Sequence, residues 1–275
     1  MRTDKLILSL TLSLTLALSA GCSDDDVNNT PADSAVPDMS ANADQAPVVD
    51  KTVLPADRGT SFKFAIQFKD HLAGTFLAGV KVCIKDTATC VTATGTGISS
   101  SANLTLPTDK DSILLITHSG YMNMALFVGK DNVEVGTSMF LIPTSMEAQM
   151  ATKAGVTLDK TKAMLRITAL EALGGGYGNA ALELKPASGD GPMAADKDGY
   201  PDPTKAKTGA YTQAWAWYFN VATGDYTLQV KDNDGNICDV FIGWKDASKT
   251  TATAKIKPVA GHINVMEFRC KEQKT

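Results

Sequence analysis

The stretch from Trp215 to Cys238 constrains the fold more than any other part of the chain. In residues 215–221 every second side chain is large and apolar, which is the period-two pattern of a half-buried strand. Turn residues fill 222–225, and the alternation then resumes over 226–230. Asp234-Gly235 is a pair that favours a tight hairpin. The stretch therefore predicts antiparallel β structure.

Short alternating segments continue this pattern along most of the chain. Gly, Pro, Asp or Asn bounds each of them, at spacings typical of a sandwich rather than a parallel sheet. The expected strands are 61–68, 79–84, 102–106, 113–117, 123–128, 133–142, 163–170, 180–184, 240–244, 251–256 and 263–268. The predicted fold class is all-β, with two tandem Ig-like or transthyretin-like antiparallel β-sandwiches joined by a short helix.

A change of pattern near the middle of the chain marks the predicted boundary. Thr144, Ser145 and Glu147 can cap a short helix over 146–154, and Gly155 can end it. The expected divisions are a signal peptide at 1–21, a lipidated Cys22 with a disordered acidic linker at 22–58, a first sandwich at 59–143, a helical connector at 144–160, a second sandwich at 161–271 and a tail at 272–275.

The N-terminal residues have the composition of a signal peptide. Arg2 and Lys5 form a positive start, and residues 6–20 are apolar apart from small hydroxyl side chains. A membrane-spanning helix needs about 20 apolar residues, so this shorter run predicts cleavage instead of a retained anchor. The residues before Cys22 resemble the bacterial lipoprotein signal, in which this cysteine is lipidated. An ordinary secretory signal is the alternative.

Residues 23–58 read as a disordered stalk. They contain eight aspartates against only Lys51 and Arg58, together with four prolines and few apolar residues. Such a segment cannot bury enough surface to offset the entropy of ordering. The remaining body, from residue 59, is nearly neutral and offers no basic field to attract nucleic acid.

Four cysteines remain once Cys22 is assigned to a lipid, and an exported chain predicts disulfides between them. Three connectivities are possible. A turn at 86–87 would place Cys83 opposite Cys90 across a hairpin, which leaves Cys238 to pair with Cys270. The histidines are scattered and no Cys-x-x-Cys motif is present, so a zinc site is disfavoured.

Exposed aromatic side chains are the candidates for ligand binding. Trp217 shares a strand face with Phe219 and is expected in the core, whereas Trp215, at the start of the strand, and Tyr218, on its other face, are the candidates for stacking against a sugar ring. Core packing is the alternative for the whole set.

Asp196, Asp198 and Asp202 alternate around a glycine and form a weak candidate Ca²⁺ site. The acidic residue that closes an EF-type loop is missing, so turn residues are the competing interpretation. The acidic segment 232–236 could also be interpreted as a Ca²⁺ site, but the residue preferences of a hairpin turn account for it. No other cofactor is predicted.

Enzyme signatures are weak throughout. His118-Ser119 are neighbours on a strand and so point to opposite faces, and Gly-x-Ser-x-Gly and His-Glu-x-x-His are absent. A glycine-rich match at 174–181 precedes a strand instead of the helix that a dinucleotide site requires. A cryptic hydrolase would have to combine the long polar loop predicted at 185–209 with His262, which would need to approach Asp196, Asp198 or a serine in a cleft.

Residues 77–83, 102–107 and 119–121 of the first half, and 178–184, 218–221 and 224–228 of the second, are similar to the carboxypeptidase regulatory-like, or transthyretin-like, β-sandwich. The whole arrangement resembles surface lipoproteins of myxobacterium-type bacteria. In carboxypeptidases this module is an accessory without catalytic residues, so the resemblance implies scaffolding or binding.

The sequence therefore predicts a non-catalytic lipoprotein held outside the cytoplasm, at the outer membrane or cell surface, by its N-terminal lipid. Its expected role is binding or structural, and a glycan or a protein is the expected partner. A carbohydrate-binding or adhesive module and a cryptic hydrolase are the alternatives.

Overall fold

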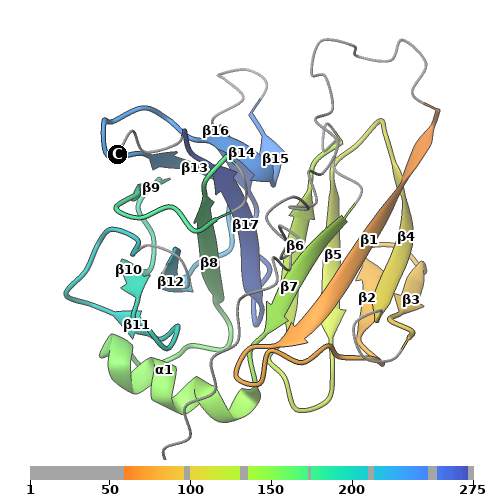
Figure 1. The fold of residues 1–275 in the computed structure, drawn as a ribbon, viewed down its shortest axis with the longest axis horizontal. Helices are drawn as coiled ribbons and strands as arrows, with labels where there is room; N and C mark the ends of the chain where they lie inside the picture. Colours follow the sequence, from red (N-terminus) through yellow and green to blue (C-terminus); the bar gives the residue numbers. More distant parts are fainter. Residues whose placement is uncertain are drawn as a thin grey trace, which may run out of the picture. The chain divides into compact units, whose positions relative to one another are not determined.

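Strands make up nearly all of the secondary structure in the computed structural model (Figure 1). The structure describes residues 59–95, 100–130, 136–172, 175–209, 214–246 and 253–271. The predicted signal peptide, Cys22 and the acidic linker up to Arg58 lie outside these ranges. The prediction of an all-β fold with a short helix is confirmed.

The strands form three sheets, here named sheets A, B and C. Sheet A contains, in spatial order, β4 (Ser101–Pro107), β1 (Ser61–Asp70) and β7 (Gly136–Leu141). Sheet C contains β15 (Trp244–Lys245), β16 (Thr253–Ile256), β13 (Tyr226–Lys231) and β9 (Ala181–Lys185).

Sheet B is the largest of the three and draws strands from both halves of the chain. Its order is β11 (Pro201–Asp202), β10 (Asp190–Ala195), β12 (Trp215–Val221), β8 (Ala163–Leu170), β17 (Ile263–Arg269), β6 (Met124–Val128), β5 (Ser112–Thr117), β2 (Lys81–Ile84) and β3 (Cys90–Thr92), with β14 (Asp239–Ile242) also beside β17. The last strand of the chain therefore lies in the middle of this sheet.

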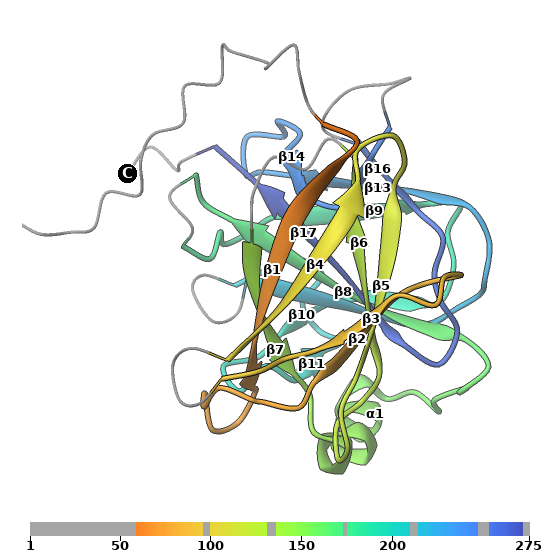
Figure 2. The ribbon, with the colours of Figure 1, turned by 90° about the vertical axis from the view of Figure 1, so that its right-hand side faces the viewer.

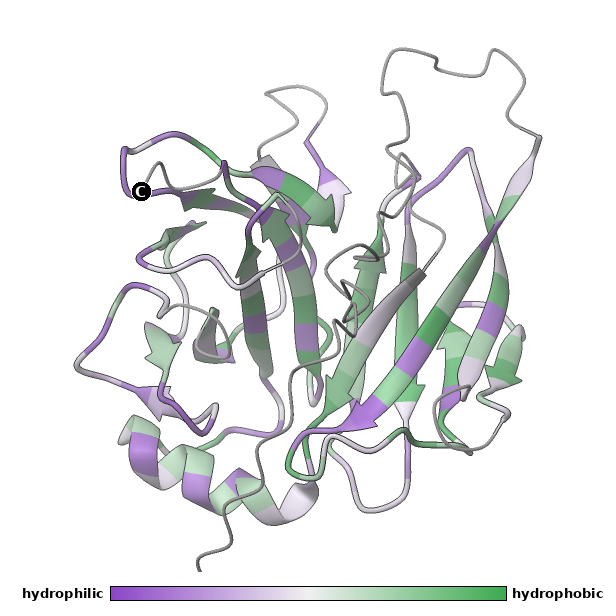
Figure 3. Cartoon of the chain, viewed as in Figure 1, coloured by the Kyte–Doolittle hydropathy of each residue, from purple (hydrophilic) through white to green (hydrophobic). Residues whose placement is uncertain are grey.

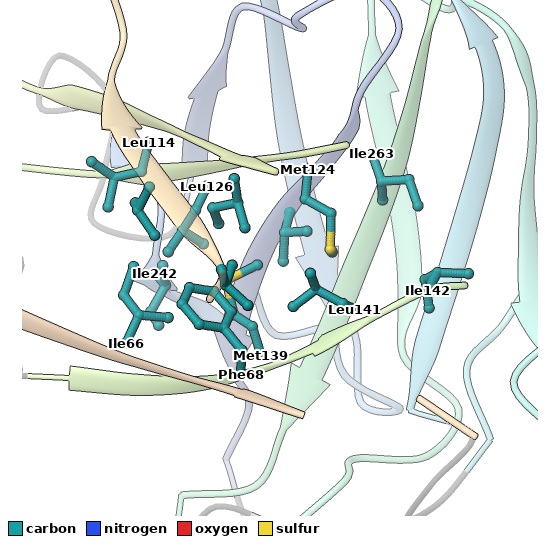
Figure 4. Packing of buried hydrophobic residues seen from close by; sticks show 14 of the residues in the cluster. Ile66, Phe68, Leu114, Met124, Leu126, Met139, Leu141, Ile142, Ile242 and Ile263 are labelled. Atoms are coloured by element: carbon teal, nitrogen blue, oxygen red, sulfur yellow. The ribbon is translucent and has the colours of Figure 1, made fainter. Parts of the chain in front are cut away.

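Both faces of sheet B are covered, so the body has two hydrophobic cores. On β1 the apolar and polar residues alternate, as the bands along this strand in Figure 3 show, and Phe64, Ile66 and Phe68 are buried. They pack with Leu114 and Leu126 of sheet B in the first core (Figure 4). In the view of Figure 2, β1 and β4 lie in front of β5 and β6.

The second core lies on the opposite face of sheet B, against sheet C. It contains Phe127, Leu165 and Phe268 from sheet B and Leu228 and Val230 from β13. Neighbouring residues of one strand thus enter different cores, because successive side chains on a strand point to opposite faces. Two sandwiches are present, but they share their middle layer instead of following each other as separate units. The pairs β1–β7, β17–β6 and β17–β8 are also parallel, whereas antiparallel sheets were predicted.

β17 joins the two halves of the chain. It pairs in parallel with β6 of the first half, from Ile263 opposite Met124, and in parallel with β8 of the second half, from Ile263 opposite Met164. All of the described elements belong to one compact unit.

The predicted helix is present as a 3-10 turn, Thr144–Met146, followed by α1, Glu147–Ala154. Neither helix has a side-chain cap hydrogen bond, so the predicted capping by Thr144 or Ser145 is wrong. Gly155 ends α1 in the left-handed conformation, at φ 68°, as expected. The helix packs against β11 (Figure 1).

Two local predictions need correction. The segment 185–209 contains β10 and β11, which extend sheet B; its glycines and prolines concealed the buried Met193, Ala194 and Ala195. Gly235 turns the chain at φ 82° and Lys231 bridges to Ile237 across the turn, but the hairpin ends there, because β14 leaves β13 and pairs with β17 in sheet B.

The disulfides are Cys83–Cys90 and Cys238–Cys270, which is the expected connectivity. The first closes the β2–β3 hairpin, where the two cysteines are opposite each other. The second joins the residue before β14 to the residue after β17, and both of its cysteines are buried. It therefore fixes the end of the strand on which the two halves meet.

Removing the two disulfides is expected to have unequal effects. A cross-link stabilises by restricting the unfolded chain, more so for a longer loop. The sequence separations are 32 residues for Cys238–Cys270 and 7 for Cys83–Cys90, so replacing each pair by alanine should lower the free energy of unfolding by about 4 and about 2 kcal/mol. Urea unfolding of the two double variants checks the order, and a larger loss for the hairpin pair would contradict it.

Candidate functional site

A cavity of about 550 Å³ lies where the first core meets the second half of the chain. It is named the Trp215 cavity here. Its walls include His71 and Leu72 from the turn after β1, Phe140 of β7, Thr168 of β8, Asp198 from the β10–β11 turn and Trp215 of β12. With Gly176, which precedes β9, six separate segments contribute to this cavity.

Three aromatic rings form one corner of this cavity. The ring centroids of His71 and Trp215 are 5.2 Å apart, and those of Phe140 and Trp215 are 6.1 Å apart, both pairs tilted. His71 and Phe140 meet edge to face at 6.4 Å. Such tilted and edge-on contacts fix the rings relative to one another.

Arg166 supports Trp215 from the interior of the protein. It is 3% exposed, its Nη1 donates to the Phe140 carbonyl over 2.9 Å, and its guanidinium carbon lies 5.1 Å from the Trp215 ring centroid. That distance is within the range of a cation–π interaction. Burial lowers the pKa of Arg166 to about 10, against the opposing charge of Glu267, so the guanidinium stays charged at neutral pH.

Asp70 organises the turn that carries His71 and Leu72. One carboxylate oxygen accepts the backbone N–H groups of Leu72 and Ala73 over 2.7 and 2.6 Å, and the other accepts the Tyr121 hydroxyl over 2.6 Å. Burial opposes ionisation, but these hydrogen bonds outweigh it and lower the pKa of Asp70. The turn is therefore held by a charged group at neutral pH.

Asp196 has the same role in the β10–β11 turn. It accepts the backbone N–H groups of Asp198 and Tyr200, both over 2.9 Å, and pairs with Lys153 of α1 over 2.6 Å. At Gly199, φ is 83°, and a Cβ there would lie 2.7 Å from two His71 ring atoms. Glycine is therefore required where this turn meets the aromatic corner.

The three aspartates of the candidate calcium site are each paired with a lysine. Asp198 pairs with Lys197 over 2.8 Å and Asp202 with Lys205 over 3.0 Å, as Asp196 does with Lys153. Within the ranges that the structure describes, no group of three or more His, Cys, Asp or Glu side chains could hold a metal ion. Turn chemistry accounts for these carboxylates.

The two predicted sugar-stacking residues are not brought together. Trp215 lines the cavity, but Tyr218 is 4% exposed and packs in the second core. The expectation that Tyr218 is exposed is wrong, because the strand is covered on both faces rather than half-buried. Burial also raises the pKa of Tyr218.

His262 lines a different and smaller cavity, of about 240 Å³, together with Glu147 and Asp159. Asp198 lines the Trp215 cavity, and Asp196 sits in the same turn. His262 Nδ1 contacts the Ala260 carbonyl over 2.8 Å. Among the described residues, no serine lines either cavity. The arrangement required for the cryptic hydrolase is therefore not formed.

Sequence reasoning missed His71, Phe140, Thr168 and Arg166. Arg166 does carry a signal, because it stands at a strand position whose neighbours two residues away, Met164 and Thr168, face the first core. A charge at such a position implies a buried partner. His71 and Phe140 converge on Trp215 because β1 pairs with β7. No local pattern in the sequence indicates this contact.

Acidification is expected to destabilise the body through His71. Burial, and then the charge of Arg166, lower the pKa of His71 below the ordinary 6.5. The unfolded chain therefore binds the proton first, and stability that is complete above pH 6.5 is lost as the pH falls below it. Carboxylates with lowered pKa, such as Asp70, lose their contribution only at more acid pH.

The measurement compares Tm at pH 7.5 and 5.5 for the wild type and His71→Gln. The wild type should lose more Tm between these two values than the variant does. An equal loss in both proteins would show that His71 does not carry the effect.

No protein-family model matches the chain, and no curated protein is similar to it. Similar solved structures include the minor pilin GBS52 of Streptococcus agalactiae, at 11% identity and a TM-score of 0.25, with 78% of this chain and 97% of that chain covered. The shaft pilin SpaA of Lactobacillus rhamnosus GG has 11% identity and a TM-score of 0.20, with 78% and 100% covered.

The Bacillus anthracis TIE protein has 14% identity and a TM-score of 0.24, with 78% of this chain covered. This chain spans about a third of that protein, 35%. At such TM-scores the likeness determines neither a topology nor a function. In the described part of the chain, no helix is both long and apolar enough to cross a bilayer.

Proposed function

We propose that the chain is a non-catalytic lipoprotein of the bacterial cell surface, with a binding or structural role. A lipid on Cys22 holds it at the outer membrane, the acidic linker at 22–58 spaces the body from the bilayer, and the β-sandwich body meets its partner outside the cell.

The use of the five cysteines carries this proposal. Four of them form the two disulfides of the body, as expected for an exported protein. The fifth, Cys22, directly follows the apolar N-terminal segment and precedes the acidic linker. A cysteine in that place is where a lipid would be attached.

The cavities support a non-catalytic role. Neither brings a nucleophile, a base and an orienting group together within the described residues. A carbohydrate-binding or adhesive role is the second candidate, because Trp215 faces a cavity of ligand size.

Metabolic labelling with a radioactive fatty acid tests the anchor. The wild-type chain should incorporate label and fractionate with membranes, whereas Cys22→Ala should do neither. External protease should cleave the wild-type protein on intact cells, and a cytoplasmic protein serves as the uncleaved control. Unlabelled wild-type protein, or labelled protein inaccessible to the protease, would overturn the proposal.

A further inference from the structure

The Trp215 cavity has the size of a ligand site, whereas the second cavity is too small. Small-molecule sites have volumes of about 300–1,000 Å³. The Trp215 cavity, at about 550 Å³, falls within this range, and the His262 cavity, at about 240 Å³, falls below it. Of the two cavities, the Trp215 cavity is therefore the one with the volume of a small-molecule site.

The indole N–H groups distinguish Trp215 from the other two tryptophans. Trp217 Nε1 donates to the Gly199 carbonyl over 3.2 Å, and Trp244 Nε1 donates to the Ser112 carbonyl over 3.1 Å. The indole N–H of Trp215 has no acceptor among the described residues. This nitrogen is not one of the buried unpartnered atoms of the described residues, so it is accessible, and because Trp215 lines the cavity the donor is available to a ligand.

A second free polar group lies on the same wall. Thr168, which is directly opposite Trp215 in the β8–β12 pair, is only 7% exposed and lines the cavity. Its hydroxyl has no partner among the described residues. The hydroxyl oxygen is not one of the fully buried unpartnered atoms of the described residues, so it is open to water or a ligand in the cavity.

The rim of the cavity supplies further polar groups and one apolar side chain. Asp198 and Lys197 form an ion pair over 2.8 Å and offer an acceptor and a donor side by side. Leu72, on the opposite turn, is 62% exposed. An aromatic wall with a few directed polar groups suits a ring that has apolar C–H faces and hydroxyl groups at its edge.

The charges around the cavity select among such rings. Arg166 lies within 5.1 Å of the Trp215 ring and attracts its π electrons, so the ring is a poor partner for a second cation. Protonation of His71 beside Arg166 is also disfavoured. A positively charged ring is therefore a poor partner for the face of Trp215, whereas a neutral or acidic ring does not meet this penalty.

We propose that the Trp215 cavity binds one neutral or acidic sugar ring of a polysaccharide, stacked on Trp215 and hydrogen-bonded through Thr168, Asp198 and the indole N–H. This inference deepens the proposed surface role by naming the class of ligand. Arg166 is a positioning residue, because it holds Trp215 without reaching the sugar.

An array of immobilised neutral, acidic and amino sugars tests the proposal with the full chain in detergent. The wild type should bind neutral or acidic sugars and leave protonated amino sugars unbound. Trp215→Ala should weaken binding at least tenfold, and Trp215→Phe, which keeps a ring but loses the N–H, should weaken it less. Ligand should change the indole fluorescence of the wild type.

The chain offers a matched control. Leu72 and Ile237 are the large apolar side chains most exposed in the described ranges, at 62% and 41%, and only Leu72 lines the cavity. Leu72→Asp should weaken binding, whereas Ile237→Asp should leave it unchanged. If Trp215→Ala does not fold, Leu72→Asp and Asp198→Asn provide the same comparison.

Three results would overturn the sugar site. They are a wild type that binds none of the array, a Trp215→Ala variant that folds and binds as well as the wild type, and a preference for protonated amino sugars. None of these affects fatty-acid labelling at Cys22, so a failure of the ligand inference is distinguishable from a failure of the surface proposal.

Discussion

Expressed separately, residues 59–160 and residues 161–271 are expected not to fold into stable sandwiches. Each half would expose a face of sheet B that the intact body covers, and the first half would lose the pairing of β6 with β17. Phe127 of the first half packs in the second core, and Trp217 of the second half packs in the first. Circular dichroism and urea unfolding should show little cooperative structure in either half.

The control is the intact body cleaved once in the connection between α1 and β8. Both halves are then present, and the shared sheet should hold them together after the cut. Separate halves that each unfold cooperatively, with the stability of the intact body, would contradict the expected dependence.

Trp217→Ala is expected to lower the free energy of unfolding by about 5 kcal/mol. Truncation of a large buried aromatic side chain costs about 3–5 kcal/mol, and the Gly199 carbonyl would lose the indole N–H that it accepts. Trp217 is fully buried and stacks on Phe219 at 6.2 Å. A loss of this size is comparable to the whole stability of many domains, about 5–15 kcal/mol.

Urea unfolding measures the effect, and two substitutions separate its parts. Trp217→Phe keeps an aromatic ring but removes the N–H donor, so its loss should be smaller. Trp244→Ala removes a partly buried indole of the second core and should cost less than Trp217→Ala. Equal losses at the two tryptophans would show that burial of Trp217 is not decisive.

Much of the fold was predictable because strand alternation is a local property. The segments 61–68, 163–170 and 263–268 were expected as strands and correspond to β1, β8 and β17. β10 was missed because glycine, proline and alanine give little alternation, although its pairing with β12 buries Met193 and Ala194. This segment forms a strand because it pairs with β12, and its own residues do not indicate that pairing.

The candidate site was less predictable for the same reason. Trp215 was expected at an exposed strand end and does line a cavity, whereas Tyr218 was expected to be exposed on the other face and is buried. Its burial follows from the cover that sheet C gives to the second face of sheet B. The sharing of one sheet by two cores depends on where β17 inserts, and hydrophobic period alone does not specify that position.

β1 is the central strand of sheet A, with β4 on one side and β7 on the other. A pull on the chain just ahead of Ser61 would therefore run along a strand whose hydrogen bonds lie across the direction of the force. Many bonds of the two ladders would bear such a load together, in shear, instead of opening one after another. If the body is tethered at this end, the tether therefore enters a strand that is difficult to pull out of its sheet.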